Sequence, residues 1–280
     1  MSLKENCVLW IIKLNIMRNY RKRGLWLASL MLWLGLGMSF AAEPRYLNIV
    51  FVGNSITYGA GLEEPRREAP PVRAAIYLKR SADVQVVRYS NQGVSGNTTV
   101  DFLPATETYF NKVREAADQF RDETWATLLF SIMLGTNDSA IRGTNGCPVA
   151  PETYRENLRQ IIDRLLALYP NARFVVHRPI WYSPNTYNGA MYLQEGLDRL
   201  TAYYPELVAL VEEYGKRFPG QVFLGDTEGY DYFRTNAEEL FQAENGNAGV
   251  FYLHPNKRGA VALGELWGKA IAKALYGDEE

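Results

Sequence analysis

Short apolar runs alternate along the chain with longer stretches whose apolar residues recur at helical spacing. The apolar runs predict buried strands at residues 47–52, 84–89, 126–134, 173–177 and 221–224. The spacing predicts helices at residues 68–80, 107–120, 151–169, 190–217 (as one helix or two) and 257–276. Because the strands are continuously apolar and alternate with helices, the pattern indicates a parallel sheet covered by helices on both faces. We therefore predict one α/β domain over residues 43–280, a three-layer α/β/α sandwich with a five-stranded parallel sheet.

The beginning of the chain has a different pattern. A basic stretch at residues 18–23 precedes an uncharged apolar run over residues 24–40, which ends in small residues. This order is typical of a secretory signal peptide, and the run is short for a membrane span. We expect residues 1–42 to be a cleavable signal peptide with an upstream extension, Met1 or Met17 being the start. The expected location is then periplasmic or extracellular, without stable membrane insertion after cleavage.

Charge and reactive residues narrow the function. The chain has 30 basic and 31 acidic residues, and residues 1–42 hold six basic and one acidic, so the remainder has a net charge of −6. An acidic domain disfavours nucleic acid as a partner. Of the two histidines, His177 lies within an apolar strand and is expected in the core. Cys147 is the one cysteine after residue 42 and is expected to be unreactive. The sequence implies no metal or organic cofactor.

Four polar blocks carry the candidate chemistry. Three follow predicted strands, where ligands bind in parallel sheets, and one precedes the last helix. They are Gly53-Asn54-Ser55-Ile56-Thr57, residues 91–98, Gly135-Thr136-Asn137-Asp138 and His254-Pro255-Asn256. In this order they resemble the SGNH (GDSL-like) hydrolase family, named for a Ser, a Gly, an Asn and a His, which are matched here by Ser55, Gly96, Asn137 and His254. The resemblance spans nearly all of residues 43–280 and implies a flavodoxin-like fold and an ester hydrolase.

The chemistry of these side chains agrees with the resemblance. A serine hydroxyl needs a base to become a nucleophile, so Ser55 would attack the ester carbonyl while His254 takes its proton. The backbone N–H groups of Ser55 and Gly96 and the amide of Asn137 would then stabilise the oxyanion. Taken singly, Ser55 also fits a helix cap, residues 135–138 a plain turn, and His254 a surface loop. Their joint occurrence favours catalysis.

One position departs from the family pattern. The family usually has an Asp three residues before the His, where it orients the imidazole, and this chain has Phe251 there. A backbone carbonyl holding His254 in a Ser–His dyad is one alternative. A second is a carboxylate from elsewhere, either Asp226 after the fifth strand or Glu244 ten residues before His254. The third is a weakly active protein, and the sequence leaves all three open.

Two loops bear on the substrate. Residues 178–188 follow the fourth strand and read Arg-Pro-Ile-Trp-Tyr-Ser-Pro-Asn-Thr-Tyr-Asn, and residues 225–232 add Asp, Glu and two Tyr. Aromatic and polar residues at the rim of a site suit sugars, although Trp181 and Tyr182 also fit packing beneath the loop. The sequence thus favours a small-molecule or glycan ester as the substrate, and removal of acetyl groups from carbohydrates through an acyl-enzyme on Ser55. The alternatives are a lipid or aryl acyl esterase and a non-catalytic sugar-binding domain.

Overall fold

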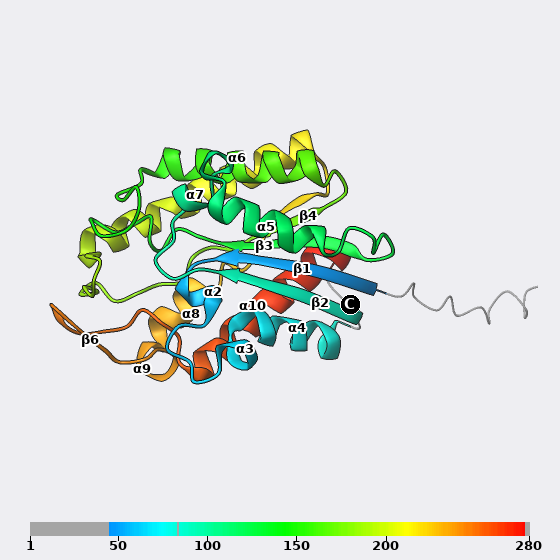
Figure 1. Ribbon diagram of the computed structural model, residues 1–280. Helices are drawn as coiled ribbons and strands as arrows, with labels where there is room; N and C mark the ends of the chain where they lie inside the picture. Colours follow the sequence, from blue (N-terminus) through cyan, green and yellow to red (C-terminus); the bar gives the residue numbers. More distant parts are fainter. Residues whose placement is uncertain (1–44, 83, 278–280) are drawn as a thin grey trace, which may run out of the picture. The chain divides into compact units, whose positions relative to one another are not determined.

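A five-stranded parallel sheet lies between two layers of helices in the computed structural model, which describes residues 45–82 and 84–277 (Figure 1). The strand order is β2-β1-β3-β4-β5. The strands are β1 (Arg45–Gly53), β2 (Val84–Gly93), β3 (Thr127–Met133), β4 (Arg173–Val176) and β5 (Val222–Leu224). The predicted three-layer α/β/α fold with five parallel strands is confirmed. The predicted signal peptide, residues 1–42, lies outside the described residues.

The helices divide between the two faces of the sheet (Figure 1). One face carries α4 (Pro70–Ser81) and α10 (Lys257–Tyr276), and the other carries α5 (Thr108–Asp118), α6 (Pro151–Leu168) and α7 (Leu193–Arg217). Alternate side chains of β1 point to opposite faces. Leu47, Ile49 and Phe51 join the core beneath α4 and α10, and Val50 and Val52 join the core on the other side. All five are almost fully buried, as the continuous apolar run predicts.

Short elements at the carboxyl ends of the strands account for most differences from the prediction. They are α2 (Ser55–Tyr58), α3 (Pro65–Glu68), η1 (Val100–Phe102), η2 (Pro104–Thr106), α8 (Gly229–Thr235), α9 (Ala237–Leu240), β6 (Glu244–Gly246) and β7 (Gly249–Phe251). Each is too brief to show a hydrophobic period. Strand β2 runs four residues beyond its predicted end, because Ser90 to Gly93 continue to pair with β1 at the edge of the sheet. Residues 193–217 form one helix despite Pro205 within it.

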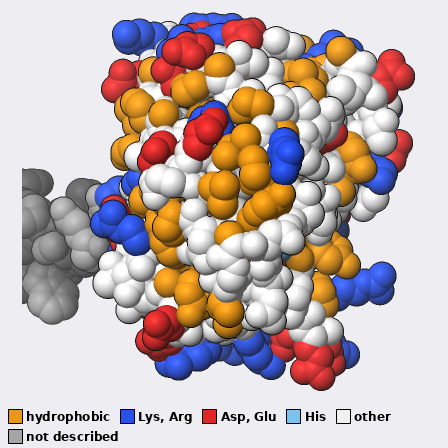
Figure 2. All heavy atoms as spheres, turned by 90° about the vertical axis from the view of Figure 1, so that its left-hand side faces the viewer, with side chains coloured by type: hydrophobic (Ala, Val, Ile, Leu, Met, Phe, Trp, Pro, Cys, Tyr) orange, Lys and Arg blue, Asp and Glu red, His pale blue; other side chains and the backbone are white. Residues whose placement is uncertain are grey.

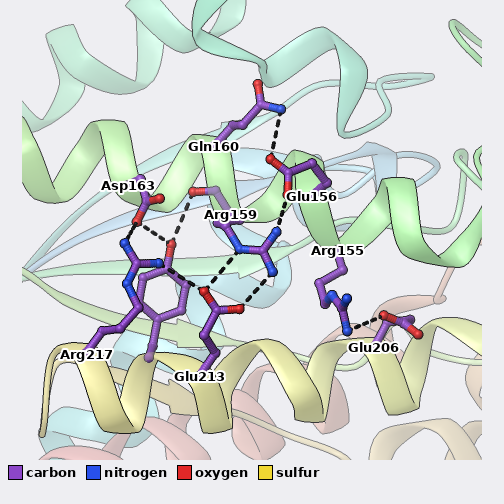
Figure 3. A network of polar contacts seen from close by, with 9 residues as sticks. Arg155, Glu156, Arg159, Gln160, Asp163, Glu206, Glu213 and Arg217 are labelled. Atoms are coloured by element: carbon purple, nitrogen blue, oxygen red, sulfur yellow. Dashed lines mark hydrogen bonds and ion pairs between the residues drawn. The ribbon is translucent and has the colours of Figure 1, made fainter.

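Helices α6 and α7 are joined by a network of ion pairs (Figure 3). The pairs that cross between the helices are Arg155–Glu206, Arg159–Glu213 and Arg217–Asp163, with N···O distances of 3.0, 2.8 and 3.3 Å. Partly exposed pairs of this kind contribute at most about 1 kcal/mol each. They bridge the two helices at three points along their length, above the buried side chains through which α6 and α7 pack. This matters because Tyr192, the residue before α7, reaches the site described next.

Within the described residues, no helix is both long and apolar enough to cross a membrane.

Candidate active site

The carboxyl ends of three neighbouring strands bring the polar blocks together. The register places Gly93, Gly53 and Met133 side by side at the ends of β2, β1 and β3. Ser55 and Gly96 follow this row within three residues, and Asn137 follows it within four. Figure 2 looks onto this edge of the sheet, where apolar side chains gather in the middle of the face. Three sequence blocks that are far apart in the chain thus meet at one edge.

Ser55 lies at a tight turn between β1 and α2. A side chain at Gly53 would place its Cβ 2.0 Å from Thr57 Oγ1, so this turn requires glycine. Asn54 caps the helix, its side-chain oxygen accepting a hydrogen bond from the N–H of Ile56 at 3.0 Å. The N–H of Ser55 is left without an acceptor among the described residues. The hydroxyl therefore stands at the beginning of a helix beside a free backbone donor.

His254 joins Ser55 to a carboxylate. Its Nε2 lies 2.9 Å from Ser55 Oγ, and its Nδ1 lies 3.0 Å from each carboxylate oxygen of Glu244. The backbone N–H of His254 also donates to Glu244 Oε1, at 3.1 Å. A carboxylate only accepts hydrogen bonds, so Nδ1 carries the imidazole proton and Nε2 presents its lone pair to the serine hydroxyl. This is the tautomer that a general base needs.

The carboxylate comes from a hairpin that the sequence pattern did not reveal. Strands β6 and β7 pair antiparallel, and Glu244 on β6 lies directly opposite Phe251 on β7. Phe251, at the position where the family usually has an Asp, is buried in the core with 1% of its surface exposed. The hairpin thus carries a carboxylate across from the position that lacks one. Of the alternatives that the sequence leaves open, the geometry favours Glu244.

Asp226 and His177 are engaged elsewhere. Asp226 Oδ1 accepts hydrogen bonds from the N–H groups of Glu228 and Gly229, at 3.0 and 3.1 Å, and burial raises the pKa of this carboxyl to about 6. The Asp226 N–H donates to His177 Nδ1, so His177 Nε2 carries the proton and donates to Ser131 Oγ. Burial lowers the pKa of His177 to about 3, which keeps the ring neutral. His177 is therefore a core residue, as predicted.

Gly96 and Asn137 complete a set of candidate oxyanion donors. Gly96 has a φ of +83°, which favours glycine, and its N–H has no acceptor among the described residues. Asn137 Nδ2 donates to the carbonyl of Asn97 at 2.8 Å, and its Oδ1 accepts from the hydroxyl of Tyr192 at 2.7 Å. Because a carbonyl can only accept, this pair of contacts fixes which way the amide points. One N–H of the amide is left for a ligand.

Asp138 joins the loop that follows Gly96 to the loop that carries Asn137. This carboxyl is fully buried, and its Oδ1 accepts from the N–H of Thr99 at 2.9 Å and from the Thr99 hydroxyl. Asn157 on α6 donates to the same hydroxyl, at 2.9 Å. Burial raises the pKa of Asp138 to about 6. Sequence reasoning missed Tyr192 and Asp138 as parts of this site. The one signal in the sequence was that Asp138 directly follows Asn137, and nothing pointed to Tyr192.

The aromatic rim expected from the sequence is only partly present. Tyr182 is wholly buried and hydrogen bonded to Ser139, and Tyr230 is 7% exposed, so neither ring faces a ligand. Trp181 is half-buried against Phe241. These rings pack beneath their loops because apolar rings gain more by burial than by exposure at the rim.

The loop after β4 instead supports the hairpin. Asn185 Nδ2 donates to the carbonyl of Val250 at 2.6 Å, and Ser183 exchanges two hydrogen bonds with Tyr252, at 2.8 and 2.9 Å. Tyr187 O accepts from the N–H of Asn247. These contacts fix the hairpin that carries Glu244.

Cys147 is partly buried, and its sulfur accepts a hydrogen bond from the Thr144 N–H at 3.4 Å. Across residues 45–82 and 84–277 there is no group of three His, Cys, Asp or Glu side chains arranged to hold a metal ion.

Comparisons with known proteins give one family. Residues 51–262 match the profile of the GDSL-like lipase/acylhydrolase family. No curated protein matches the chain significantly in sequence. Three similar solved structures show the same fold.

A catalytic mutant of Axe2, an acetylxylan esterase from Geobacillus stearothermophilus, is 17% identical with a TM-score of 0.54, covering 85% of this chain and 98% of its own. Est24, a carbohydrate acetylesterase from Sinorhizobium meliloti, is 16% identical with a TM-score of 0.52, and the match covers 80% of this chain and 98% of Est24. A proposed arylesterase from Agrobacterium tumefaciens is 16% identical with a TM-score of 0.52, and the match covers 81% of this chain and 99% of the arylesterase.

Proposed function

Since this chain belongs to the GDSL-like lipase/acylhydrolase (SGNH) family, we propose that it hydrolyses carboxylic esters at Ser55. The roles proposed are nucleophile for Ser55, general base for His254 and orienting carboxylate for Glu244. The observation that carries the proposal is the unbroken hydrogen-bonded series from Glu244 through both ring nitrogens of His254 to the hydroxyl of Ser55. Such a series activates a hydroxyl that is otherwise a weak nucleophile.

The reaction has two halves. Ser55 Oγ attacks the ester carbonyl while its proton passes to His254 Nε2, which forms a tetrahedral intermediate. The intermediate collapses as that proton moves to the leaving alcohol, and the acyl group remains on Ser55. Water then attacks the acyl-enzyme, His254 takes a proton from it, and the same proton returns to Ser55 as the acid leaves. The negative charge of Glu244 stabilises the imidazolium that forms in each half.

The negative oxygen of each intermediate needs fixed donors. The N–H groups of Ser55 and Gly96 and the remaining N–H of Asn137 are proposed to supply them. The N–H groups of Ser55 and Gly96 have no acceptor among the described residues, and Asn137 is fixed by Tyr192 and Asn97. Removing one such donor typically costs about 10²–10³ in rate.

For the substrate, we propose acetyl groups on carbohydrates, acted on outside the cytoplasm. The support for this is the pattern of a signal peptide in residues 1–42 and the similarity to structures that include an acetylxylan esterase and a carbohydrate acetylesterase. A second candidate is an esterase for aryl or lipid acyl groups. The apolar centre of the face in Figure 2 and the similarity to an arylesterase favour that candidate.

Initial rates on p-nitrophenyl acetate and p-nitrophenyl octanoate, for the wild type and for Ser55→Ala, test this function. We expect rapid turnover of the acetate, much slower turnover of the octanoate, no turnover by the variant, and release of acetic acid from acetylated xylan. Faster hydrolysis of octanoate would replace the acetylesterase proposal with the second candidate. Turnover by Ser55→Ala equal to that of the wild type would reject the nucleophile.

A further inference from the structure

A groove at the end of α2, the helix that begins with Ser55, is not used by the reaction just described. It has a volume of about 610 Å³ and lies between α2, α3, α4 and the edge strand β2. Its lining includes Tyr58, Arg66, Tyr89 and Asn91. Tyr58 is the fourth residue of the helix that begins with Ser55, so the two are about 4.5 Å apart along the helix axis. The volume lies within the usual range for small-ligand sites, about 300–1,000 Å³.

Two tyrosines give the groove aromatic walls. Tyr58 is 49% exposed and Tyr89 is 37% exposed, which is high for such large rings. The Tyr89 ring packs edge-to-face on buried Phe51, with the centroids 6.2 Å apart, so its orientation is held from below. Asn91 links the groove to α2, because its side chain donates a hydrogen bond to the carbonyl of Thr57 at 2.9 Å. Exposed tyrosine rings stack on the C–H faces of pyranose rings while their hydroxyls remain in water.

Two arginines give the groove a local positive charge. Arg66 and Arg67 both line it, and Glu64 is the one acidic residue in its lining. Glu64 forms an ion pair with Arg67 at 3.1 Å, whereas Arg66 has no ion-pair partner among the described residues. Outside residues 1–42 the chain has a net charge of −6, so a locally basic groove runs against the overall charge. A guanidinium group binds a carboxylate through two parallel hydrogen bonds.

We propose that this groove binds a uronic acid unit of the acetylated glycan, which would make acidic polysaccharides the substrate class. The inference rests on the proposed function. The pyranose ring stacks between Tyr58 and Tyr89, and its carboxylate pairs with Arg66. The neighbouring acetylated sugar then lies toward Ser55, because Tyr58 and Ser55 are one helical turn apart.

Isothermal titration calorimetry on the inactive Ser55→Ala protein tests the groove directly. The ligands are a xylo-oligosaccharide bearing one glucuronic acid and the same oligosaccharide without it. We expect the acidic ligand to bind about 5- to 10-fold more tightly, and Arg66→Gln added to Ser55→Ala to abolish this preference. The preference should fall as salt is raised.

Arg80→Gln is the matched control. Arg80 is exposed near the other end of α4, and its removal changes the net charge equally. We expect it to leave the preference unchanged, and the melting temperatures of both arginine variants to stay close to that of their parent. Equal affinity for the two ligands, or a preference that survives Arg66→Gln, would overturn the proposal. An equal loss in Arg66→Gln and Arg80→Gln would overturn it too, because the effect would then be one of net charge.

Rates of the wild-type protein separate this inference from the function on which it rests. Faster deacetylation of acetylated glucuronoxylan than of the same polymer without glucuronic acid supports both. Equal rates on the two polymers keep the esterase function and reject the uronate subsite. Hydrolysis of p-nitrophenyl acetate without release of acetate from either polymer, together with tight binding of the acidic oligosaccharide, keeps the uronate-binding groove and rejects the glycan acetylesterase.

Discussion

Replacing Glu244 with Gln tests the most unusual part of the site. The substitution keeps the size of the side chain and removes its charge. In the structure both carboxylate oxygens lie 3.0 Å from His254 Nδ1. A glutamine has one oxygen and one NH₂ group there, and the NH₂ group can donate to Nδ1. The imidazole proton then moves to Nε2, where it faces Ser55, and the ring can no longer accept the serine proton.

The expected magnitude follows from this change of tautomer. An Asp-to-Asn change in the triad of a serine protease lowers kcat by about 10⁴. Here the side chains of His254 and Glu244 are 15% and 25% exposed, so solvent partly screens their interaction. We therefore expect Glu244→Gln to lower kcat on p-nitrophenyl acetate by about 10³, which is about 4 kcal/mol of transition-state stabilisation. KM should change little, because Glu244 is not placed to touch the substrate.

The assay compares kcat and KM of three proteins. The wild type and Glu244→Gln are measured beside Glu238→Gln, which removes the same charge from an exposed position on α9. We expect the control to keep wild-type kcat. A kcat for Glu244→Gln within tenfold of the wild type would refute the reasoning, because His254 would then be oriented by something other than this carboxylate.

Four further predictions concern residues around the site and in the fold. Asn137→Ala should lower kcat on p-nitrophenyl acetate about 10²–10³-fold, because it removes one donor to the oxyanion. Tyr192→Phe should lower kcat about tenfold at nearly constant KM, because the Asn137 amide remains and loses only the hydrogen bond from the Tyr192 hydroxyl. Asp226→Asn should keep kcat within twofold and raise the melting temperature more at pH 8 than at pH 4.5. The folded-state pKa of Asp226 is raised to about 6 from 3.8, so its ionisation destabilises the wild type as pH rises through that interval. Glu213→Gln should lower the free energy of unfolding by less than about 1 kcal/mol in urea titrations, with a smaller loss in high salt, because its ion pair with Arg159 is partly exposed. An unchanged rate for Asn137→Ala, a tenfold loss in Asp226→Asn or a loss of several kcal/mol in Glu213→Gln would contradict the respective prediction.

The long elements of the fold were predictable because each carries its own hydrophobic pattern. The buried run 47–52 lies within β1, and the helical spacing in residues 257–276 marks α10 with the observed ends. The positions of Ser55 and Asn137 at one sheet edge followed from the rule that ligands bind at the carboxyl ends of parallel strands. These features depend on local periodicity and on one topological rule, both of which a single sequence contains.

The remaining parts of the site depend on contacts between distant segments. Strands β6 and β7 have three residues each, too few to show a period, so the hairpin that aligns Glu244 with His254 could not be predicted. The sequence proposed Glu244 and Asp226 on equal terms, and only packing separates them. Tyr182 was expected at a sugar-binding rim or beneath its loop, and burial against Ser139 decides for the second. Composition describes which side chains a loop has and not which way they point.

Trapping of the acyl-enzyme is the measurement that tests the central claim most directly. Wild-type protein is mixed with p-nitrophenyl acetate, quenched in acid during turnover, digested and analysed by mass spectrometry, with Ser55→Ala treated in the same way. We predict one acetyl group on the peptide that contains Ser55 in the wild type, and none on the same peptide of the variant. Hydrolysis with no acetyl group on Ser55, or with acetylation of a different residue that tracks turnover, would contradict the account.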